Sequence, residues 1–172
     1  RAVVGGSADV VSGAFEHTIN MQSKGQRMRA FVLQGRAPQI VLGINPHTMP
    51  DYKSIADLKG RKIGYSVGGF EEALLKTMLA KTGLKLEDVT LVNVNFSLSP
   101  ALLSKQVDAV IGAFRNFELN QLDLAKKPGR AFYPEEEGVP PYDELVLVAN
   151  RDKLNDPRLG RFVAALEQAT LY

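Results

Sequence analysis

The side chains that could carry out chemistry are few in this sequence. Its two histidines, His17 and His47, stand in no catalytic motif, and cysteine is absent. The phosphate-binding glycine loop, the nucleophile elbow and the HExxH zinc motif are also absent. The acidic run Glu135–Glu137 lies among prolines, where a solvated surface is more common than a metal site. We therefore expect neither an enzyme nor a bound metal or cofactor.

Residues suited to binding a small molecule are easier to find. Ser66-Val-Gly68-Gly69 stands between an expected strand and an expected helix, where free backbone N–H groups and small residues leave room for a polar ligand. A plain strand–helix turn explains these residues equally well. Glu71 and Glu72 follow in the first helical turn, and they disfavour a strongly anionic ligand over a neutral or cationic, nitrogen-rich one.

A second set of candidates combines aromatic rings with polar groups. Phe114, Arg115 and Asn116 follow an apolar stretch, and Tyr142 and Glu144 lie further along the chain. Aromatic faces stack on flat rings, and a carboxylate accepts hydrogen bonds from ring amino groups, so this set suits an aromatic heterocycle. Arg115 favours a different ligand, because its guanidinium could pair with an anion.

Two similar stretches place these candidates at the ends of strands. Asp108–Phe114 and Asp9–Phe15 both resemble a short apolar strand that ends at glycine and opens into a helix. Ligands of α/β proteins bind beside the carboxyl ends of such strands. We therefore expect the two stretches to form opposite walls of one cleft, with chance similarity as the alternative. Phe117, just after the later stretch, is expected in the core.

Strands and helices alternate along the chain, which indicates an α/β fold with mainly parallel sheets. Ser12 is expected to cap the first helix, and Ser99-Pro100 to start a later one. We expect strands at 8–12, 28–34, 39–44, 62–66, 89–94, 108–113, 130–133 and 144–149, and helices at 14–24, 55–58, 70–82, 101–106, 115–126 and from 157 onward.

The breaks in this pattern predict two lobes. Asn45-Pro46 interrupts the chain after the third strand, and the strand at 144–149 returns toward the first lobe. We expect a first lobe at 1–45, a second lobe at 46–145 and a return to the first lobe at 146–172. Because the chain starts at Arg1 and Gly5-Gly6 resembles a helix end, we expect the N-terminal part of the first lobe to be missing.

The composition excludes several classes of protein. The 172 residues are 45% hydrophobic and 23% charged, as in ordinary globular domains. The net charge is +2 and forms no basic block, so nucleic acid is not an expected partner. No apolar run is long enough to span a bilayer.

Several segments resemble a known family. Ser54–Gly64 resembles the opening of the second lobe in periplasmic solute-binding proteins of ABC importers, and Val107–Gly112 resembles their later strand. Gly112–Gln121 and Glu137–Leu145 are more particular. They resemble the branch that binds pyrimidine precursors of thiamine and is related to the yeast pyrimidine-precursor synthase.

The resemblance implies a two-lobed type II periplasmic-binding fold. A small heterocycle, such as a hydroxymethyl- or aminomethyl-pyrimidine, would be held between the lobes and passed to an ABC permease in the membrane. The protein would be periplasmic or otherwise extracytoplasmic, with or without a lipid anchor. Together with the residues above, the resemblance gives as ligand-binding candidates Gly13, Ala14, His17, Ser66, Gly68, Gly69, Phe114, Arg115, Asn116, Tyr142 and Glu144.

Two other functions stay open. One is a pyrimidine-precursor synthase that uses His17, although the cysteine-rich motif of those relatives is missing from this sequence. The other is a binder of sulfonate, nitrate or a similar anion that uses Arg115.

Overall fold

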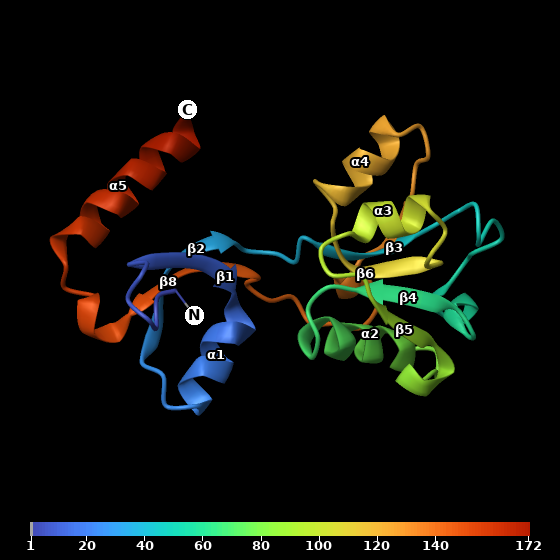
Figure 1. The fold of residues 1–172 in the computed structure, drawn as a ribbon, viewed down its shortest axis with the longest axis horizontal. Helices are drawn as coiled ribbons and strands as arrows, with labels where there is room; N and C mark the ends of the chain where they lie inside the picture. The colour runs from blue at the N-terminus through green and yellow to red at the C-terminus, as the bar shows by residue number, and fades with distance from the viewer. Residues whose placement is uncertain (1) are drawn as a thin grey trace. The chain divides into compact units, whose positions relative to one another are not determined.

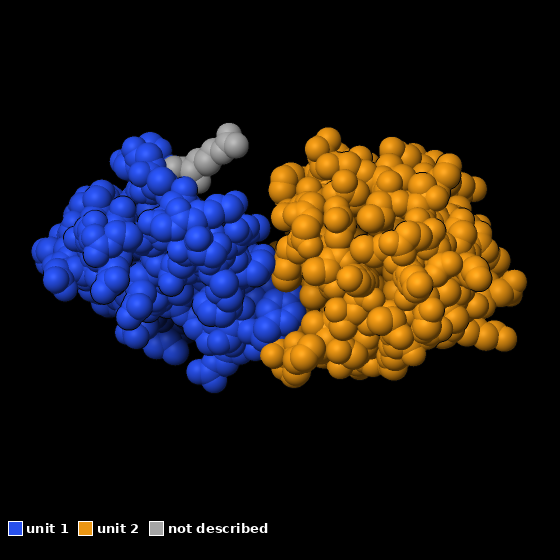
Figure 2. Space-filling model, turned by 90° about the horizontal axis from the view of Figure 1, so that it is seen from below, with its two compact units in different colours: residues 1–37, 142–172 blue, residues 38–141 orange. Residues whose placement is uncertain are grey.

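The computed structural model describes residues 2–172, and their contacts divide the chain into two compact units. Unit 1 holds residues 1–37 and 142–172, and unit 2 holds residues 38–141 (Figure 2). The divisions therefore fall several residues before the expected lobe boundaries at 45/46 and 145/146.

The sheet of unit 1 is antiparallel throughout, with the strand order β1-β8-β2 (Figure 1). The first and second strands run in the same direction and are joined by a helix, as the alternating pattern suggested. The last strand of the chain lies between them and runs the opposite way, so the expectation of mainly parallel sheets is wrong here. The elements of unit 1 are β1 (Val10–Ala14), α1 (Phe15–Ser23), β2 (Met28–Gly35), β8 (Leu145–Asn150), a 3-10 turn at Arg151–Lys153 and α5 (Pro157–Leu171).

The start of α1 differs from the expectation in its cap. Ser12 lies inside β1, and its hydroxyl donates to Oε1 of Gln34 in β2 (2.6 Å). The N-cap is Ala14, whose side chain makes no capping hydrogen bond. Strand pairing explains the shift, because β1 stays paired with β8 as far as Ala14, opposite Leu145.

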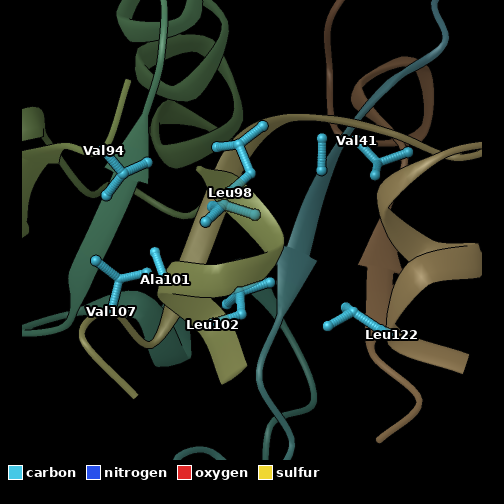
Figure 3. Packing of buried hydrophobic residues seen from close by; sticks show 9 residues of the cluster. Val41, Val94, Leu98, Ala101, Leu102, Val107 and Leu122 are labelled. Atoms are coloured by element: carbon cyan, nitrogen blue, oxygen red, sulfur yellow. The ribbon is translucent and has the colours of Figure 1, made fainter. Parts of the chain in front are cut away.

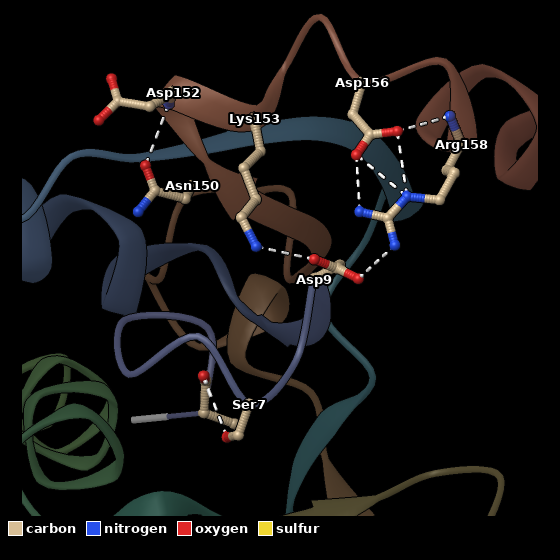
Figure 4. Close-up of polar contacts among 8 residues, drawn as sticks. Ser7, Asp9, Asn150, Asp152, Lys153, Asp156 and Arg158 are labelled. Carbon is tan, nitrogen blue, oxygen red and sulfur yellow. Dashed lines mark hydrogen bonds and ion pairs between the residues drawn. The ribbon is translucent and has the colours of Figure 1, made fainter.

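A group of exposed ion pairs joins the start of β1 to the start of α5 (Figure 4). Asp9 accepts hydrogen bonds from Lys153 Nζ (2.9 Å) and Arg158 Nη1 (3.1 Å). Asp156 caps α5 by accepting the Arg158 N–H (2.9 Å). The bond from Lys153 holds the pKa of Asp9 below its usual range, and the bonds from Arg158 lower the pKa of Asp156 to about 2. Exposed pairs of this kind position elements more than they stabilise them.

Unit 2 is a mixed five-stranded sheet with the order β5-β4-β6-β3-β7. The first three strands in that order are parallel to one another, whereas β3 is antiparallel to both of its neighbours. Because β3 pairs with β6 and β7, it belongs to unit 2 and not to the first lobe. The strands are β3 (Ile40–Ile44), β4 (Lys62–Tyr65), β5 (Thr90–Asn93), β6 (Ala109–Phe114) and β7 (Arg130–Phe132), and the α-helices are α2 (Phe70–Ala80), α3 (Leu98–Leu103) and α4 (Glu118–Leu124).

Helices cover both faces of this sheet, with α2 on one face and α3 and α4 on the other (Figure 1). Short 3-10 turns at Ile55–Leu58, Leu86–Asp88 and Pro134–Glu136 complete the unit. Side chains of the sheet interlock with those of α3 and α4 in one buried cluster (Figure 3). Its buried members are Val41, Val94, Leu98, Ala101, Leu102, Val107, Val110, Ala113 and Leu122.

Two helices of unit 2 begin at residues other than those expected. Helix α3 starts at Leu98, so Ser99 and Pro100 lie within its first turn, because Leu98 is drawn into the core at 3% exposure. Helix α4 starts at Glu118, and Phe117 is 56% exposed instead of packing in the core. The residues after β6 therefore form a turn of three residues before the helix.

The buried cluster predicts a clear stability difference between two leucines of unit 2. Leu102 is 2% exposed, so we expect Leu102→Ala to lower the free energy of unfolding by about 2–5 kcal/mol through lost contacts and a cavity. Leu124 is 85% exposed, and Leu124→Ala should change it by less than about 0.5 kcal/mol. Urea denaturation of both variants measures the difference, and equal values would contradict the described packing.

Candidate functional site

Three neighbouring parallel strands of unit 2 end at one edge of the sheet. Strand β4 lies between β5 and β6 and is parallel to both, so the turns that follow these strands are neighbours. The turn after β4 holds the candidates Ser66, Gly68 and Gly69. The strand end and turn of β6 hold Phe114, Arg115 and Asn116, so the structure places these two predicted groups at adjacent strand ends.

A buried carboxyl group, that of Glu71, shapes the turn after β4. Glu71 is 3% exposed, although it lies in the first turn of α2. Its Oε2 accepts hydrogen bonds from the backbone N–H groups of Ser66 (2.6 Å) and Val67 (3.1 Å). The carboxylate therefore satisfies two donors that follow the strand and fixes the path of the chain between Tyr65 and α2.

The same carboxyl group contacts a bulge in β6. The pairing of β3 with β6 passes from Val41–Ala113 directly to Leu42–Ile111, which leaves Gly112 as an extra residue. Gly112 has a φ of +99°, and a Cβ built on it would overlap the Glu71 carboxyl group, 2.8 Å from Oε2. Glycine is therefore required both for the backbone conformation and for the space that Glu71 fills. The strand end expected at this glycine is a bulge inside the strand.

Glu118 makes a similar contact at the end of β6, the strand next to β4. It stands at the first position of α4, and its Oε2 accepts the backbone N–H of Phe114 at the end of β6 (2.6 Å). Burial raises the pKa of Glu71, and the negative charge of Glu118 raises it further, while the N–H groups of Ser66 and Val67 lower it. The edge of the sheet thus carries two neighbouring carboxyl groups.

The remaining polar groups at this edge differ in how they are engaged. The Ser66 hydroxyl is buried and has no hydrogen-bond partner among the described residues. The Arg115 guanidinium donates twice to the carboxylate of Glu135 (3.0 and 3.3 Å) and lies over the ring of Tyr133, 4.4 Å from its centroid. Its charge is already paired, which weakens the case for Arg115 as an anion receptor.

The other candidates lie in unit 1, at the carboxyl ends of β1 and β2. Glu144 is 1% exposed, and its backbone joins the two ends. Its carbonyl accepts the N–H of Phe15 (2.9 Å), and its own N–H donates to the carbonyl of Gly35 (3.1 Å). The half-buried Tyr142 precedes it by two residues.

A cavity of about 540 Å³ in unit 1 brings three further candidates together. Gly13, Ala14 and His17 line it, with residues from β1, α1 and β8. The proposed cleft with walls at Gly13 and Gly112 stays a prediction, as does the ligand-binding role of each candidate.

Sequence reasoning missed Glu16, Glu71 and Glu118 as parts of the strand ends. In unit 1, Oε1 of Glu16 is buried without a hydrogen-bond partner among the described residues, 3.9 Å from His17 Nε2, and burial raises the pKa of this carboxyl group. A sequence signal for the three was present. The dipeptide Phe-Glu opens α1 and α2, and it stands at the N-cap and first position of α4; each of these helices is the next one after a strand.

The described part of the chain holds neither a metal-binding cluster nor a membrane-spanning helix. Within residues 2–172, no three His, Asp or Glu side chains are grouped so that they could hold a metal ion. None of the helices in that range has both the length and the apolar character needed to cross a membrane.

Comparison with known proteins places the chain in a family. The sequence profile of the family described as NMT1/THI5 like matches residues 46–172. The chain belongs to this family. A protein of Haemophilus influenzae that is named for thiamine biosynthesis is 66% identical over 120 residues, and the formylaminopyrimidine-binding protein of Halalkalibacterium halodurans is 37% identical over 121 residues. Each match covers 70% of this chain, and the chain spans 38% and 36% of these relatives.

Solved structures agree on the fold. The alkanesulfonate-binding protein of Xanthomonas axonopodis pv. citri superimposes with a TM-score of 0.73 and 22% identity, over 98% of this chain and 57% of that one. The chain therefore has the type II periplasmic-binding fold that its sequence resemblance implied. At this identity the likeness concerns the fold and not the ligand.

The burial of Glu71 generates a pH prediction. Its pKa is raised in the native state from an ordinary value of 4.5, so the native protein holds this proton to higher pH than the unfolded chain does. Its contribution to stability is present in full below pH 4.5 and is lost as the pH rises from 4.5 through the raised native pKa. We expect Glu71→Gln, which keeps an acceptor but cannot ionise, to gain stability relative to the wild type over that interval.

Urea denaturation at several pH values measures this difference. The lowered pKa values of Asp9 and Asp156 give the free energy of unfolding an opposite pH dependence in both proteins. Taking the difference between the free energies of the variant and the wild type cancels that contribution. Glu167→Gln, an exposed change on α5, is the control and should follow the wild type. A difference between the Glu71 variant and the wild type that does not vary with pH would contradict the buried, ionisable carboxyl group.

Proposed function

We propose that the chain is part of an extracytoplasmic solute-binding protein of an ABC importer, and that its ligand is a small heterocycle bearing amino groups, such as a pyrimidine precursor of thiamine. The observation that carries this proposal is the set of carboxyl groups at the strand ends. Glu71 and Glu118 stand at the edge of the unit 2 sheet, and Glu16 and Glu144 stand at the edge of the unit 1 sheet. Carboxylates accept hydrogen bonds from ring N–H and amino groups and repel anions.

The family supports the same class of ligand. One relative is named for binding formylaminopyrimidine, which carries both a flat ring and N–H donors. The alternative anionic ligand is less well supported, because the Arg115 guanidinium is already paired with Glu135. The synthase alternative gains no support from His17, whose side chain is 52% exposed, with Nε2 3.9 Å from Oε1 of Glu16.

The cellular setting follows from the same proposal. A solute-binding protein of this kind works outside the cytoplasm, with or without a lipid anchor, and delivers its ligand to an ABC permease in the membrane. It releases the ligand chemically unchanged, so turnover of an aminopyrimidine by the full-length protein would argue for the synthase instead.

A thermal-shift panel tests the class of ligand directly. We expect formylaminopyrimidine and aminomethyl-pyrimidine to raise the melting temperature of the full-length protein by several degrees, since each kcal/mol of ligand linkage is worth roughly 2–4 °C at such sizes. Alkanesulfonates and nitrate should have no effect. Stabilisation by the anions without stabilisation by the pyrimidines would overturn the proposal.

Substitution of one carboxyl group tests the chemistry of recognition. We expect Glu144→Gln to weaken pyrimidine binding by about 10- to 100-fold, because it replaces one acceptor oxygen by an NH₂ donor while keeping the shape of the side chain. Glu167→Gln removes the same charge from the exposed face of α5 and should bind as the wild type does. Isothermal titration calorimetry measures both affinities. Unchanged affinity in a folded Glu144 variant would remove this residue from the site.

A further inference from the structure

Two phenylalanines stand exposed beside the turn after β4. Phe96, in the turn between β5 and α3, is 84% exposed, and Phe117, in the turn between β6 and α4, is 56% exposed. Strand β4 lies directly between β5 and β6, so the two rings belong to the turns on either side of Ser66–Gly69. A single exposed apolar side chain is ordinary, but two aromatic side chains flanking a turn at the ligand-binding edge of a sheet need a reason.

The backbone around Phe96 is well fixed. Val94, 7% exposed, donates its N–H to the carbonyl of Tyr65 at the end of β4 (3.0 Å). Asn95 adopts a left-handed conformation with a φ of +50°, and its N–H donates to Oδ1 of Asn93 (2.8 Å). The Ser97 N–H then donates back to the carbonyl of Val94 (3.0 Å). Phe96 therefore projects from a short, hydrogen-bonded turn that is tied to the strand carrying the candidate site.

The spacing of the strands suits a flat ring between the two phenylalanines. Neighbouring strands lie about 4.8 Å apart, so β5 and β6 are separated by roughly 10 Å across β4. Interacting aromatic rings have centroids about 4.5–7 Å apart, so a third ring placed between two others needs a separation of about 9 Å or more. The strand spacing therefore leaves room for a flat ring over the turn after β4, between the turns that carry Phe96 and Phe117.

We propose that Phe96 and Phe117 are ligand contacts that hold the two sides of a flat aromatic ring, while the turn at Ser66–Gly69 supplies polar contacts to its edge. This inference rests on the proposed function and adds to it the residues that select for a flat ring. The Ser66 hydroxyl is buried without a partner among the described residues, and Ser66 directly follows β4. A ligand of the same polarity without a flat ring would lose these contacts.

Calorimetry with formylaminopyrimidine and the full-length protein tests the proposal. Stacking of a base on an aromatic side chain accounts for roughly 5- to 150-fold in affinity, so we expect Phe96→Ala to weaken binding by about that factor. Phe96→Tyr keeps the ring and should bind within about threefold of the wild type. Leu124→Ala is the matched control, because Leu124 is 85% exposed at the far end of α4 and should have no effect.

The outcomes separate this inference from the proposed function. Melting temperatures equal to the wild type would show that the variants are folded, as expected for so exposed a side chain. If the wild type binds formylaminopyrimidine and Phe96→Ala binds it equally well, the aromatic contact is overturned and the proposed function stands. If the wild type binds no aminopyrimidine, both are overturned. Loss of transport with unchanged ligand affinity in Phe96→Ala would assign the ring to a protein partner and overturn the ligand contact.

Discussion

The contact between the Glu71 carboxyl group and the bulge at Gly112 fixes the edge of the unit 2 sheet where the candidate binding residues lie. A carboxylate taken out of water is costly unless hydrogen bonds replace those of water, and here two backbone N–H groups do so. The carboxyl group reaches them because β6 bulges at a residue without a side chain. The Glu71 carboxyl group thereby ties the turn after β4 to the first turn of α2 and to the bulge in β6.

Both units place a glutamate where a strand leads into a helix, although their sheets differ. Unit 1 is antiparallel and unit 2 is mixed, yet in both a strand leads into a helix that begins with Phe-Glu. At each of these junctions the glutamate lies in the first helical turn, where the helix dipole favours a negative charge. Two of these glutamates also accept backbone N–H groups of the preceding strand or turn. This repeated use explains why carboxyl groups and aromatic rings gather at strand ends.

Much of this fold could be predicted from the sequence, and the exceptions have physical causes. Periodicity gave most elements to within a few residues, because apolar positions follow the local geometry of strands and helices. It could not show that β8 lies between β1 and β2, since that pairing joins residues more than 100 positions apart. The bulge at Gly112 was read as a strand end for the same reason. Only the pairing with β3 distinguishes a bulge from a strand end at this glycine.

The candidate site was only partly predictable. Small residues and strand ends indicated the turn at Ser66–Gly69, which the structure places directly after β4. A charged residue is rarely expected to be buried, so the burial of Glu71 in the first turn of α2 was not predicted. Phe117 was expected in the core, because the sequence does not reveal that α4 starts only after it. The pairing of Arg115 with Glu135 depends on a contact across 20 residues that no local pattern encodes.

The most direct test is an NMR titration of the full-length protein with formylaminopyrimidine. The account predicts that the largest changes in backbone amide shift occur at Ser66–Gly69 and Phe114–Phe117, because the ligand is expected at the ends of β4 and β6. Saturating ligand that shifts amides elsewhere and leaves both segments unchanged would contradict the assignment of this edge as a binding site.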